Sequence, residues 1–369
     1  MFGTILILVC TFMHIYVFWR IDSVPFIRRH LSRKILIVIG LILWIVFYCG
    51  RVFGHGANGA MAAILEFAGM NWMAVLFLIL IPIFAVDIGT LFGFIMRRVS
   101  PVLRGWAIAL GVILSVVALF QGMRPPVIQE YEVVLPNLPE GMDGTVIVAL
   151  SDLHIGSLLG EDWLTDRIEQ VREQQPDLVV LLGDTFEGHE PPASNIISKI
   201  NSFSAPLNVW AVNGNHELHG RKKIDPLGQT ELNVLRNSWK EIRPGLVVAG
   251  VDDLTVLKRS GKISDPVSTA LKGIPPGSVT VFLSHSPLLM EKAAAAGVNL
   301  MLCGHTHGGQ IWPFDYLVGL RYPLLEGRYK VKAMTVIVCR GTGTWGPRMR
   351  LWAPGEILRI TLRRTSGEI

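Results

Sequence analysis

Five short fragments in the last two-thirds of the chain carry residue types that bind metal ions. Each follows a run of apolar residues. They read Asp152-Leu153-His154, Gly183-Asp184, Gly214-Asn215-His216-Glu217, Ser284-His285 and Gly304-His305-Thr306-His307. Together they supply enough nitrogen and oxygen donors for two metal ions, and they contain no obvious nucleophilic side chain. A pair of ions in such a setting is suited to attack on a phosphoester by metal-bound hydroxide.

The mixture of donor types narrows the choice of metal. Carboxylate, imidazole and amide ligands suit Mn, Fe or Zn, whereas calcium prefers oxygen ligands alone. Asp184 directly follows its apolar run, where a carboxylate can bridge two cations. We therefore expect two divalent metal ions as cofactors.

The elements that must position these fragments are short apolar runs that alternate with helical patterns. Expected strands are 127–135, 145–150, 178–182, 209–212, 246–251, 279–283, 300–303, 335–339 and 357–362, and expected helices are 163–174, 196–203 and 291–296. This alternation predicts buried sheets covered by helices, in a layered α/β domain. Each of the five fragments falls at the C-terminal end of a predicted strand, which is the edge of an α/β sheet where ligands gather.

The fragments resemble the calcineurin-like metallophosphoesterase superfamily, whose pattern is DxH, GDxxD, GNHE/D, H and GHxH. The resemblance covers roughly residues 144–365. The runs 304–310, 340–343 and 354–356 resemble the membrane-associated branch of that superfamily, which includes transmembrane proteins with a phosphoesterase domain. The resemblance implies two mixed β-sheets sandwiched by helices.

The resemblance also implies a role for each residue. One metal would be bound by Asp152, His154, Asp184 and His307, and the other by Asp184, Asn215, His285 and His305. His216 would protonate the leaving oxygen or steady the transition state, and Glu217 would orient His216. The family usually has Asp where this chain has Glu187, so the role of Glu187 stays open. Arg340 is either a phosphate contact or part of a structural ion pair.

The first third of the chain has the composition of a membrane domain. Residues 2–19, 35–50, 72–95 and 106–120 are almost wholly apolar, and about 20 apolar residues span a bilayer. We expect a bundle of about four transmembrane helices. Glu66 is expected in the outer loop. Asp87 lies inside the third apolar segment, where a structural partner such as a nearby Arg is expected.

Charge is distributed unevenly along the chain. Residues 1–124 contain ten Lys and Arg against three acids, a net charge of +7, whereas the rest contains 24 basic and 26 acidic residues. The basic residues cluster in the first and third loops, which the positive-inside rule assigns to the cytoplasm. Residues after 124 would then face the non-cytoplasmic side. The expected division is 1–124 as transmembrane domain, 125–143 as connector and 144–369 as catalytic domain.

The sequence favours a membrane-anchored phosphoesterase that hydrolyses a phosphodiester or pyrophosphate of a lipid-linked or membrane-proximal substrate. One alternative resembles the UDP-2,3-diacylglucosamine hydrolases of lipid A synthesis, although their cytoplasmic substrate conflicts with the charge-based topology. Another is a non-catalytic metal-binding receptor or scaffold. A transporter is disfavoured by the lack of intramembrane polar pairs. Nucleic acid is not an expected partner, because the domain after residue 124 has a net charge of −2.

Overall fold

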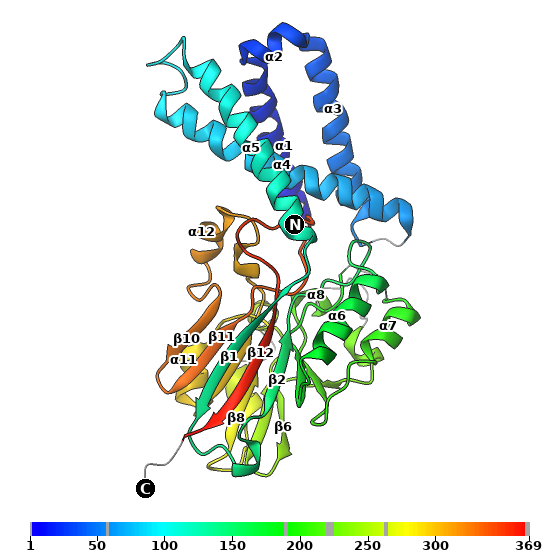
Figure 1. Cartoon of the computed structure of the whole chain (residues 1–369), viewed down its shortest axis with the longest axis vertical. Helices are drawn as coiled ribbons and strands as arrows, with labels where there is room; N and C mark the ends of the chain where they lie inside the picture. The colour runs from blue at the N-terminus through cyan, green and yellow to red at the C-terminus, as the bar shows by residue number, and fades with distance from the viewer. Residues whose placement is uncertain (1, 57–58, 188–190, 219–224, 262–264, 366–369) are drawn as a thin grey trace. The chain divides into compact units, whose positions relative to one another are not determined.

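The computed structural model describes residues 2–56, 59–187, 191–218, 225–261 and 265–365 of the chain (Figure 1). The chain divides into two compact units. One unit comprises Met1–Arg124 together with Gly346–Leu351, and the other comprises Pro125–Trp345 and Trp352–Ile369. We call them the membrane unit and the catalytic-fold unit.

The membrane unit is helical. Its elements are α1 (Phe2–Asp22), α2 (Pro25–His30), α3 (Arg33–Cys49), the π-helical turn η1 (Gly50–Gly54), α4 (Ala60–Gly89) and α5 (Ser100–Met123). Four helical stretches are long and apolar enough to cross a bilayer, namely Gly3–Asp22, Arg33–Gly54, Ala60–Gly89 and Ser100–Met123. The prediction of four long apolar helices is therefore confirmed.

Small residues allow these helices to approach closely. A Cβ atom on Gly69 of α4 would lie 2.8 Å from the carbonyl oxygen of Val46, and one on Gly50 would lie 2.3 Å from that of Leu65. On the α5 side, a Cβ atom on Gly111 would lie 2.6 Å from the Cα atom of Ile79. Glycines at helix contacts are typical of membrane bundles, where close van der Waals packing drives association.

Two acidic side chains are buried in α4, and one of them corrects a prediction. Glu66 was expected in a loop, but α4 already begins at Ala60, so Glu66 lies inside the helix. The Nδ1–H of His55 donates to Glu66 at 2.6 Å, and this partner lets the helix include the carboxylate. Asp87 pairs with Arg20 at 2.6 Å and with Arg104 at 2.7 Å, which confirms the expected arginine partner. These buried pairs also correct the expectation that the membrane segments lack polar pairs.

The segment Gly346–Leu351 packs on α5 within the membrane unit. The backbone N–H of Arg350 donates to the carbonyl oxygen of Ala118 at 2.9 Å. A Cβ atom on Gly122 would lie 2.5 Å from the carbonyl oxygen of Arg348. This late segment therefore belongs to the helical bundle, although it lies more than 200 residues after α5 in the sequence.

The catalytic-fold unit is built on two six-stranded mixed sheets. The first sheet has the order β1 (Val127–Leu135), β12 (Glu356–Arg364), β2 (Val146–Leu150), β3 (Leu178–Leu181), β4 (Val209–Ala211) and β5 (Asn233–Val234). The second has the order β10 (Gly327–Val331), β11 (Met334–Val338), β9 (Leu300–Cys303), β8 (Val279–Leu283), β7 (Leu246–Gly250) and β6 (Ser238–Arg243). The strands β2 to β5 run parallel to one another, as do β7, β8, β9 and β11.

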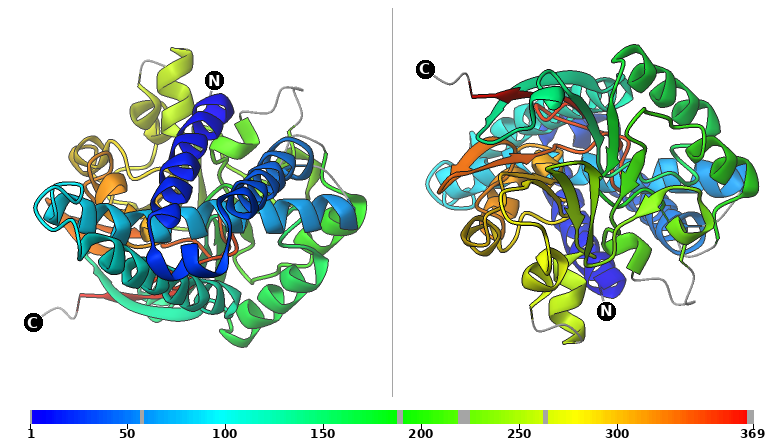
Figure 2. Two further views of the ribbon diagram at one scale, coloured as in Figure 1. Left: turned by 90° about the horizontal axis from the view of Figure 1, so that it is seen from above. Right: turned by 90° about the horizontal axis from the view of Figure 1, so that it is seen from below.

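Alternate side chains of the strands face two different cores. In β2, Ile147 and Ala149 join the core between the sheets, whereas Val148 and Leu150 pack under α6 (Glu161–Glu173) and α7 (Ser194–Ile200). The outer face of the second sheet packs under α9 (Leu254–Ser260), α10 (Pro266–Leu271) and α11 (Met290–Ala295). Figure 2 shows the two groups of helices on different sides of the strands. Burial on both faces explains why the central strands are continuous apolar runs.

The remaining elements are short and lie in loops. They are η2 (Glu140–Met142), α8 (Asn215–Leu218), η3 (Leu227–Gln229), η4 (His307–Gly309) and α12 (Phe314–Gly319). Two of them, α8 and η4, begin at residues of the ligand-bearing fragments. The parallel strands β2, β3, β4, β8 and β9 all end shortly before those fragments, with no more than two residues in between, so their loops meet along one edge.

Candidate metal centre

Five ligand-type residues at this edge have a left-handed backbone. Their φ angles are 55° for Asp152, 47° for His154, 49° for Asp184, 73° for His305 and 51° for His307. Few residues other than glycine adopt this conformation. Each such residue costs on the order of 1–3 kcal/mol and persists only where the surrounding structure enforces it. Five of them together indicate that the loops are built to aim these side chains.

Two glycines let the loops approach each other. A Cβ atom on Gly304, which follows β9, would lie 1.7 Å from Ser151 Oγ and 2.6 Å from Asp152 Oδ2. Gly183 follows β3 with a φ of 89°, and a Cβ atom there would lie 2.5 Å from the backbone nitrogen of Gly214. No other residue type fits at either position without moving a ligand-bearing loop.

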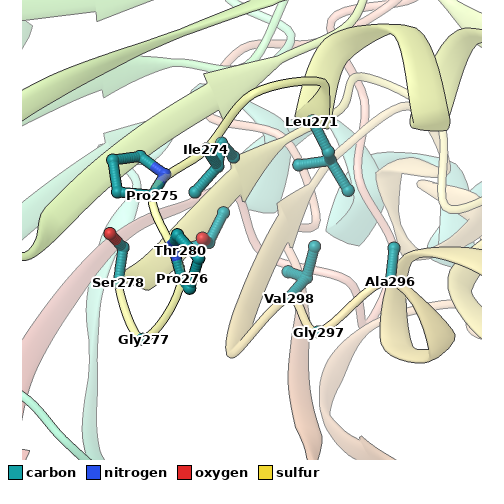
Figure 3. A pocket seen from close by; sticks show the side chains of 10 residues that line it. All are labelled: Leu271, Ile274, Pro275, Pro276, Gly277, Ser278, Thr280, Ala296, Gly297 and Val298. Atoms are coloured by element: carbon teal, nitrogen blue, oxygen red, sulfur yellow. The ribbon is translucent and has the colours of Figure 1, made fainter.

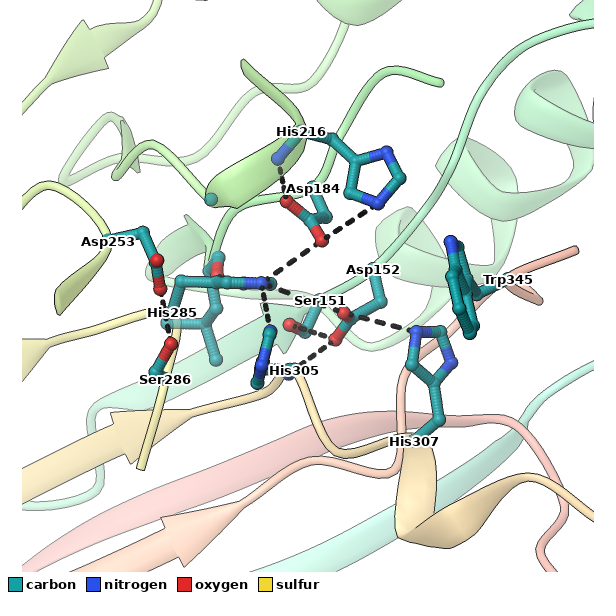
Figure 4. Close-up of polar contacts among 12 residues, drawn as sticks. Ser151, Asp152, Asp184, His216, Asp253, His285, Ser286, His305, His307 and Trp345 are labelled. Carbon is teal, nitrogen blue, oxygen red and sulfur yellow. Dashed lines mark hydrogen bonds and ion pairs between the residues drawn. The ribbon is translucent and has the colours of Figure 1, made fainter. Parts of the chain in front are cut away.

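The first group of ligands consists of Asp152, His154 and His307, of which Figure 4 shows Asp152 and His307 facing each other. His307 Nε2 lies 3.3 Å from Asp152 Oδ1 and 3.3 Å from His154 Nε2. Asp152 Oδ1 is buried and, among the described residues, has no hydrogen-bond partner. This oxygen faces imidazole nitrogens in a space closed to solvent, which is the environment of a cation ligand.

The second group consists of Asp184, His285 and His305. His285 Nε2 lies 3.1 Å from Asp184 Oδ2 and 3.0 Å from His305 Nδ1. His285 Nδ1–H donates to the carbonyl oxygen of Leu182 at 2.8 Å, so its Nε2 atom is left to face the group. Asp152 Oδ1 lies 4.0 Å from His285 Nε2, which places the two groups next to each other.

These two groups contain six of the seven residues predicted to bind metal. The structure thus brings together Asp152, His154, Asp184, His285, His305 and His307. The seventh, Asn215, begins α8 and precedes His216, whose backbone N–H donates to Asp184 Oδ1 at 2.8 Å. The predicted bridging role of Asp184 and the ligand role of Asn215 stay predictions.

Glu187 is the carboxylate that contacts His216. Its Oε2 atom accepts from His154 Nδ1–H at 2.5 Å and lies 3.2 Å from His216 Nδ1. The sequence left the role of Glu187 open and assigned the orientation of His216 to Glu217. The contacts place Glu187 at the two imidazoles, with the longer arm of glutamate reaching both.

Glu217 instead binds the backbone of the neighbouring loops. Its carboxylate accepts hydrogen bonds of 2.7–3.1 Å from four backbone N–H groups, those of Asp184, Thr185, Phe186 and Gly214. The side chain is buried. Burial, followed by the nearby charge of Asp184, raises its pKa. These contacts fix the loop after β3 against the loop after β4.

The electrostatic environment shifts the pKa values of His216 and His305 in opposite directions. Burial by itself lowers the pKa of His216, but the carboxylates of Glu187 and Asp184 outweigh it and raise that pKa to about 10. Burial lowers the pKa of His305 to about 4, and the charge of His285 adds to the effect. His216 is thus suited to hold a proton for a leaving group, whereas His305 is neutral, as a metal ligand must be.

Arg340 is engaged in an ion pair. Its Nε and Nη2 atoms donate to Glu356 Oε2 at 2.8 and 2.5 Å, and its backbone N–H donates to Glu356 Oε1 at 2.8 Å. Of the two interpretations of Arg340, these contacts favour the structural ion pair over a phosphate contact. The pair holds the start of β12 to the loop in which Gly341 lies beside His307.

Two further residues of the centre had not been predicted. Ser151 Oγ–H donates to Asp152 Oδ2 at 2.5 Å, and the Tyr322 hydroxyl lies 2.8 Å from His305 Nε2. Ser151 directly precedes the first fragment, so its position in the sequence could have indicated that it belongs to the centre. Tyr322 follows His305 by 17 residues in a loop, and no pattern marks it.

Two surface hollows of the catalytic-fold unit lie away from this edge. One, of about 240 Å³, is lined mainly by apolar and small residues that include Leu271, Ile274 and Val298 (Figure 3). Another, of about 200 Å³, lies against β6 near Lys240 and Arg243. Neither includes a residue of the five fragments. The candidate site is assigned to the ligand-bearing edge because the carboxylate and imidazole ligands converge there.

Comparison with known proteins places the same fragments in a known family. A family model described as calcineurin-like phosphoesterase matches residues 145–309. An uncharacterized metallophosphoesterase of Campylobacter jejuni is 32% identical over 261 residues, which cover 69% of this chain and 68% of that protein. A transmembrane protein with metallophosphoesterase domain of Bos taurus is 30% identical over 274 residues, which cover 70% of this chain and 62% of that protein, less than two thirds of its length.

Among solved structures, a dimetal phosphatase from Danio rerio aligns with 59% of this chain and 99% of its own, at 15% identity and a TM-score of 0.38. All five ligand-bearing fragments fall within the residues that the family model matches.

Proposed function

The chain belongs to the calcineurin-like metallophosphoesterase family, and from this premise we propose that it is a membrane-anchored hydrolase of phosphodiesters or pyrophosphates with two divalent metal ions. The observation that carries the proposal is the convergence of six carboxylate and imidazole ligands in two adjacent groups. Asp152, His154 and His307 would hold one ion, and His285, His305 and Asn215 the other, with Asp184 shared between them. The metals would be Mn, Fe or Zn.

When bound, two divalent ions would supply Lewis acidity toward phosphoryl oxygens and would lower the pKa of water from 15.7 to about 7. Proton transfer to the leaving group is carried out by side chains of the protein. His216 donates a proton from Nε2 to the leaving oxygen, because its Nδ1 atom is turned toward Glu187 and its Nε2 atom lies 3.9 Å from Asp184 Oδ2, beside the second ligand group. Glu187 holds the ring in that orientation and favours its protonated form.

We further propose that the substrate is lipid-linked or lies close to the membrane. The chain has four candidate membrane spans, and only three residues separate the end of α5 at Met123 from the start of β1 at Val127. A linker of that length spans at most about 14 Å. The catalytic-fold unit is thus tethered at the bilayer, where lipid-borne phosphoesters are concentrated. The positive loops between spans favour the non-cytoplasmic side for this unit.

The proposal is tested with the full-length protein in lipid nanodiscs. The metal content is measured by mass spectrometry, and hydrolysis of bis-p-nitrophenyl phosphate is compared with that of a monoester and of diacyl phospholipids. We expect two ions per chain, and loss of both ions and of nearly all turnover in Asp184→Asn. The matched control is Asp265→Asn, which neutralises a carboxylate paired with Lys292 outside the centre and should leave both quantities unchanged.

Three outcomes would contradict parts of this proposal. Full activity of metal-stripped protein would exclude the metal-dependent reaction. Normal metal content and turnover in Asp184→Asn would exclude the bridging role. Two bound ions with no activity on any phosphoester would favour the receptor or scaffold function instead.

A further inference from the structure

Tyr322 lies against the imidazole of His305 in the second ligand group. Its hydroxyl oxygen is 2.8 Å from His305 Nε2, and the two rings meet edge to face with centroids 5.0 Å apart. Tyr322 follows α12, and its backbone N–H donates to the carbonyl oxygen of Val318 at 2.9 Å. The side chain is half-buried, so the end of α12 holds the phenol in place beside the ligand.

The contact bears on which nitrogen of His305 can bind a metal. A neutral imidazole carries one N–H and one lone pair, and only the lone pair is a ligand. Nδ1 of His305 faces the group, 3.0 Å from His285 Nε2, whereas Nε2 faces Tyr322. If Nε2 carries the hydrogen and donates it to the phenol oxygen, Nδ1 is left free to bind. If Nδ1 carries the hydrogen, His305 cannot act as a ligand from this position.

Two other imidazoles of the centre donate through the nitrogen that faces away from the ligand groups, to other partners. His285 donates through Nδ1 to the carbonyl oxygen of Leu182, and His154 donates through Nδ1 to Glu187. Both therefore present Nε2 to the ligand groups. His305 has the opposite ring orientation, and its outward nitrogen Nε2 contacts a phenol, where those of His285 and His154 contact a carbonyl and a carboxylate.

We propose that Tyr322 is a positioning residue that accepts the Nε2–H of His305 and so fixes the tautomer that presents Nδ1 to the second metal ion. The inference rests on the proposed binuclear centre. Partners of this kind typically change metal affinity 10–100-fold when they are removed. Tyr322→Phe deletes only the oxygen and keeps the ring packing, so a purely structural role for the ring would survive the change.

The test is Co²⁺ titration of metal-stripped full-length protein in nanodiscs, followed by visible absorbance and calorimetry. In Tyr322→Phe we expect one of the two Co²⁺ sites to weaken by roughly 10–100-fold, the other to keep its affinity, and the melting temperature of the metal-free protein to stay unchanged. Tyr316→Phe is the matched control, because Tyr316 lies in α12 with its side chain 68% exposed, and it should behave like the parent.

Unchanged affinity at both sites in Tyr322→Phe would overturn the inference. Parent protein that binds fewer than two Co²⁺ ions would instead overturn the proposed function. A second measurement does not depend on the variant. The ¹⁵N spectrum of histidine-labelled, metal-free parent protein, with His305 assigned through His305→Asn, should show the hydrogen on Nε2, and a hydrogen on Nδ1 would refute the proposal.

Discussion

At the scale of single residues, Glu187 connects metal binding with proton transfer. One carboxylate oxygen contacts His154, a predicted metal ligand, and His216, the proposed proton donor. A change at Glu187 should therefore affect both, but unequally. His154 has further neighbours in its ligand group, whereas the protonation of His216 depends largely on the charge of Glu187, followed by that of Asp184.

We predict that Glu187→Gln lowers turnover far more than metal content. Removing the charge lowers the pKa of His216, and loss of a general acid typically costs 10²–10⁴-fold in rate. The loss should be largest for alkyl phosphodiesters, whose leaving groups need a proton, and small for bis-p-nitrophenyl phosphate. Measured kcat values for the two substrate types test this. Equal losses for both would argue against a role in proton donation.

At the scale of elements, the centre depends on how closely the loops after β2 and β9 meet. Gly304 is the contact point, because the space for its Cβ atom is occupied by Ser151 and Asp152. The neighbouring ligands Asp152 and His305 are both in the left-handed region, so neither loop has freedom to yield without turning a ligand away.

Gly304→Ala should therefore lose metal while the sheets remain folded. We expect the free energy of unfolding to fall by about 1–3 kcal/mol, as for other insertions into packed sites, together with loss of the ion held by the first ligand group. Metal analysis and thermal unfolding measure the two effects. Gly160→Ala is the control, since a Cβ atom on Gly160 meets nothing within 4 Å. Retention of both ions in Gly304→Ala would refute the argument.

The buried strands and the edge strand β1 could be predicted from the sequence, whereas the edge strands β6 and β10 could not. Residues 127–135 were predicted as an edge strand, and β1 has these bounds at one end of its sheet. The strand β6 reads Ser-Trp-Lys-Glu-Ile-Arg and β10 reads Gly-Arg-Tyr-Lys-Val, and both are partly exposed edges without an apolar run. Each of them pairs antiparallel with the buried strand that follows it in the chain, β6 with β7 and β10 with β11, so the pairing, and not an apolar run of its own, makes the segment a strand.

The fragments that carry the site were predictable because their residue types are required, but the roles of the two glutamates were not. The family resemblance assigned the orientation of His216 to Glu217, and it left Glu187 open because the family usually has Asp at that position. The structure reverses this, since the backbone N–H groups of two loops converge on Glu217. The left-handed backbone at five ligands also had no sequence signal, because it is imposed by tertiary contacts.

At the scale of the whole molecule, the membrane unit is held by a buried charge cluster. Asp87 is fully buried and pairs with Arg20 and Arg104, and the hydroxyl of Tyr16 also donates to it. The three charged residues come from α1, α4 and α5. One carboxylate therefore ties together three of the four long helices.

Asp87→Asn should destabilise the full-length protein severely. It leaves two buried arginines without a countercharge, and breaking a buried pair in this way costs about 3–5 kcal/mol. Thermal unfolding in detergent, followed by tryptophan fluorescence, measures the effect. Asp22→Asn is the control, because Asp22 pairs with Arg28 at a partly exposed site where about 1 kcal/mol or less is expected. Similar melting temperatures for the two variants would contradict this role.

The membrane side of the catalytic-fold unit is a separate prediction. Basic residues cluster in the segments 22–34 and 90–104, so the positive-inside rule predicts the non-cytoplasmic side for the chain after Arg124. Alkaline phosphatase fused at the C-terminus should be active, and green fluorescent protein fused there should be dark. The opposite pattern would place the unit in the cytoplasm and favour a substrate like that of the UDP-2,3-diacylglucosamine hydrolases.

The assignment of Gly346–Leu351 to the helical bundle affects how the protein can be dissected. A gene fragment that starts after Arg124 would still encode these six residues, but would lack α5, which receives the hydrogen bond of Arg350. In that fragment, Gly346–Leu351 would be exposed to solvent without its packing partner. We expect low yield and aggregation as a result. Expression trials should either retain the transmembrane helices or replace residues 346–351 with a short hydrophilic linker.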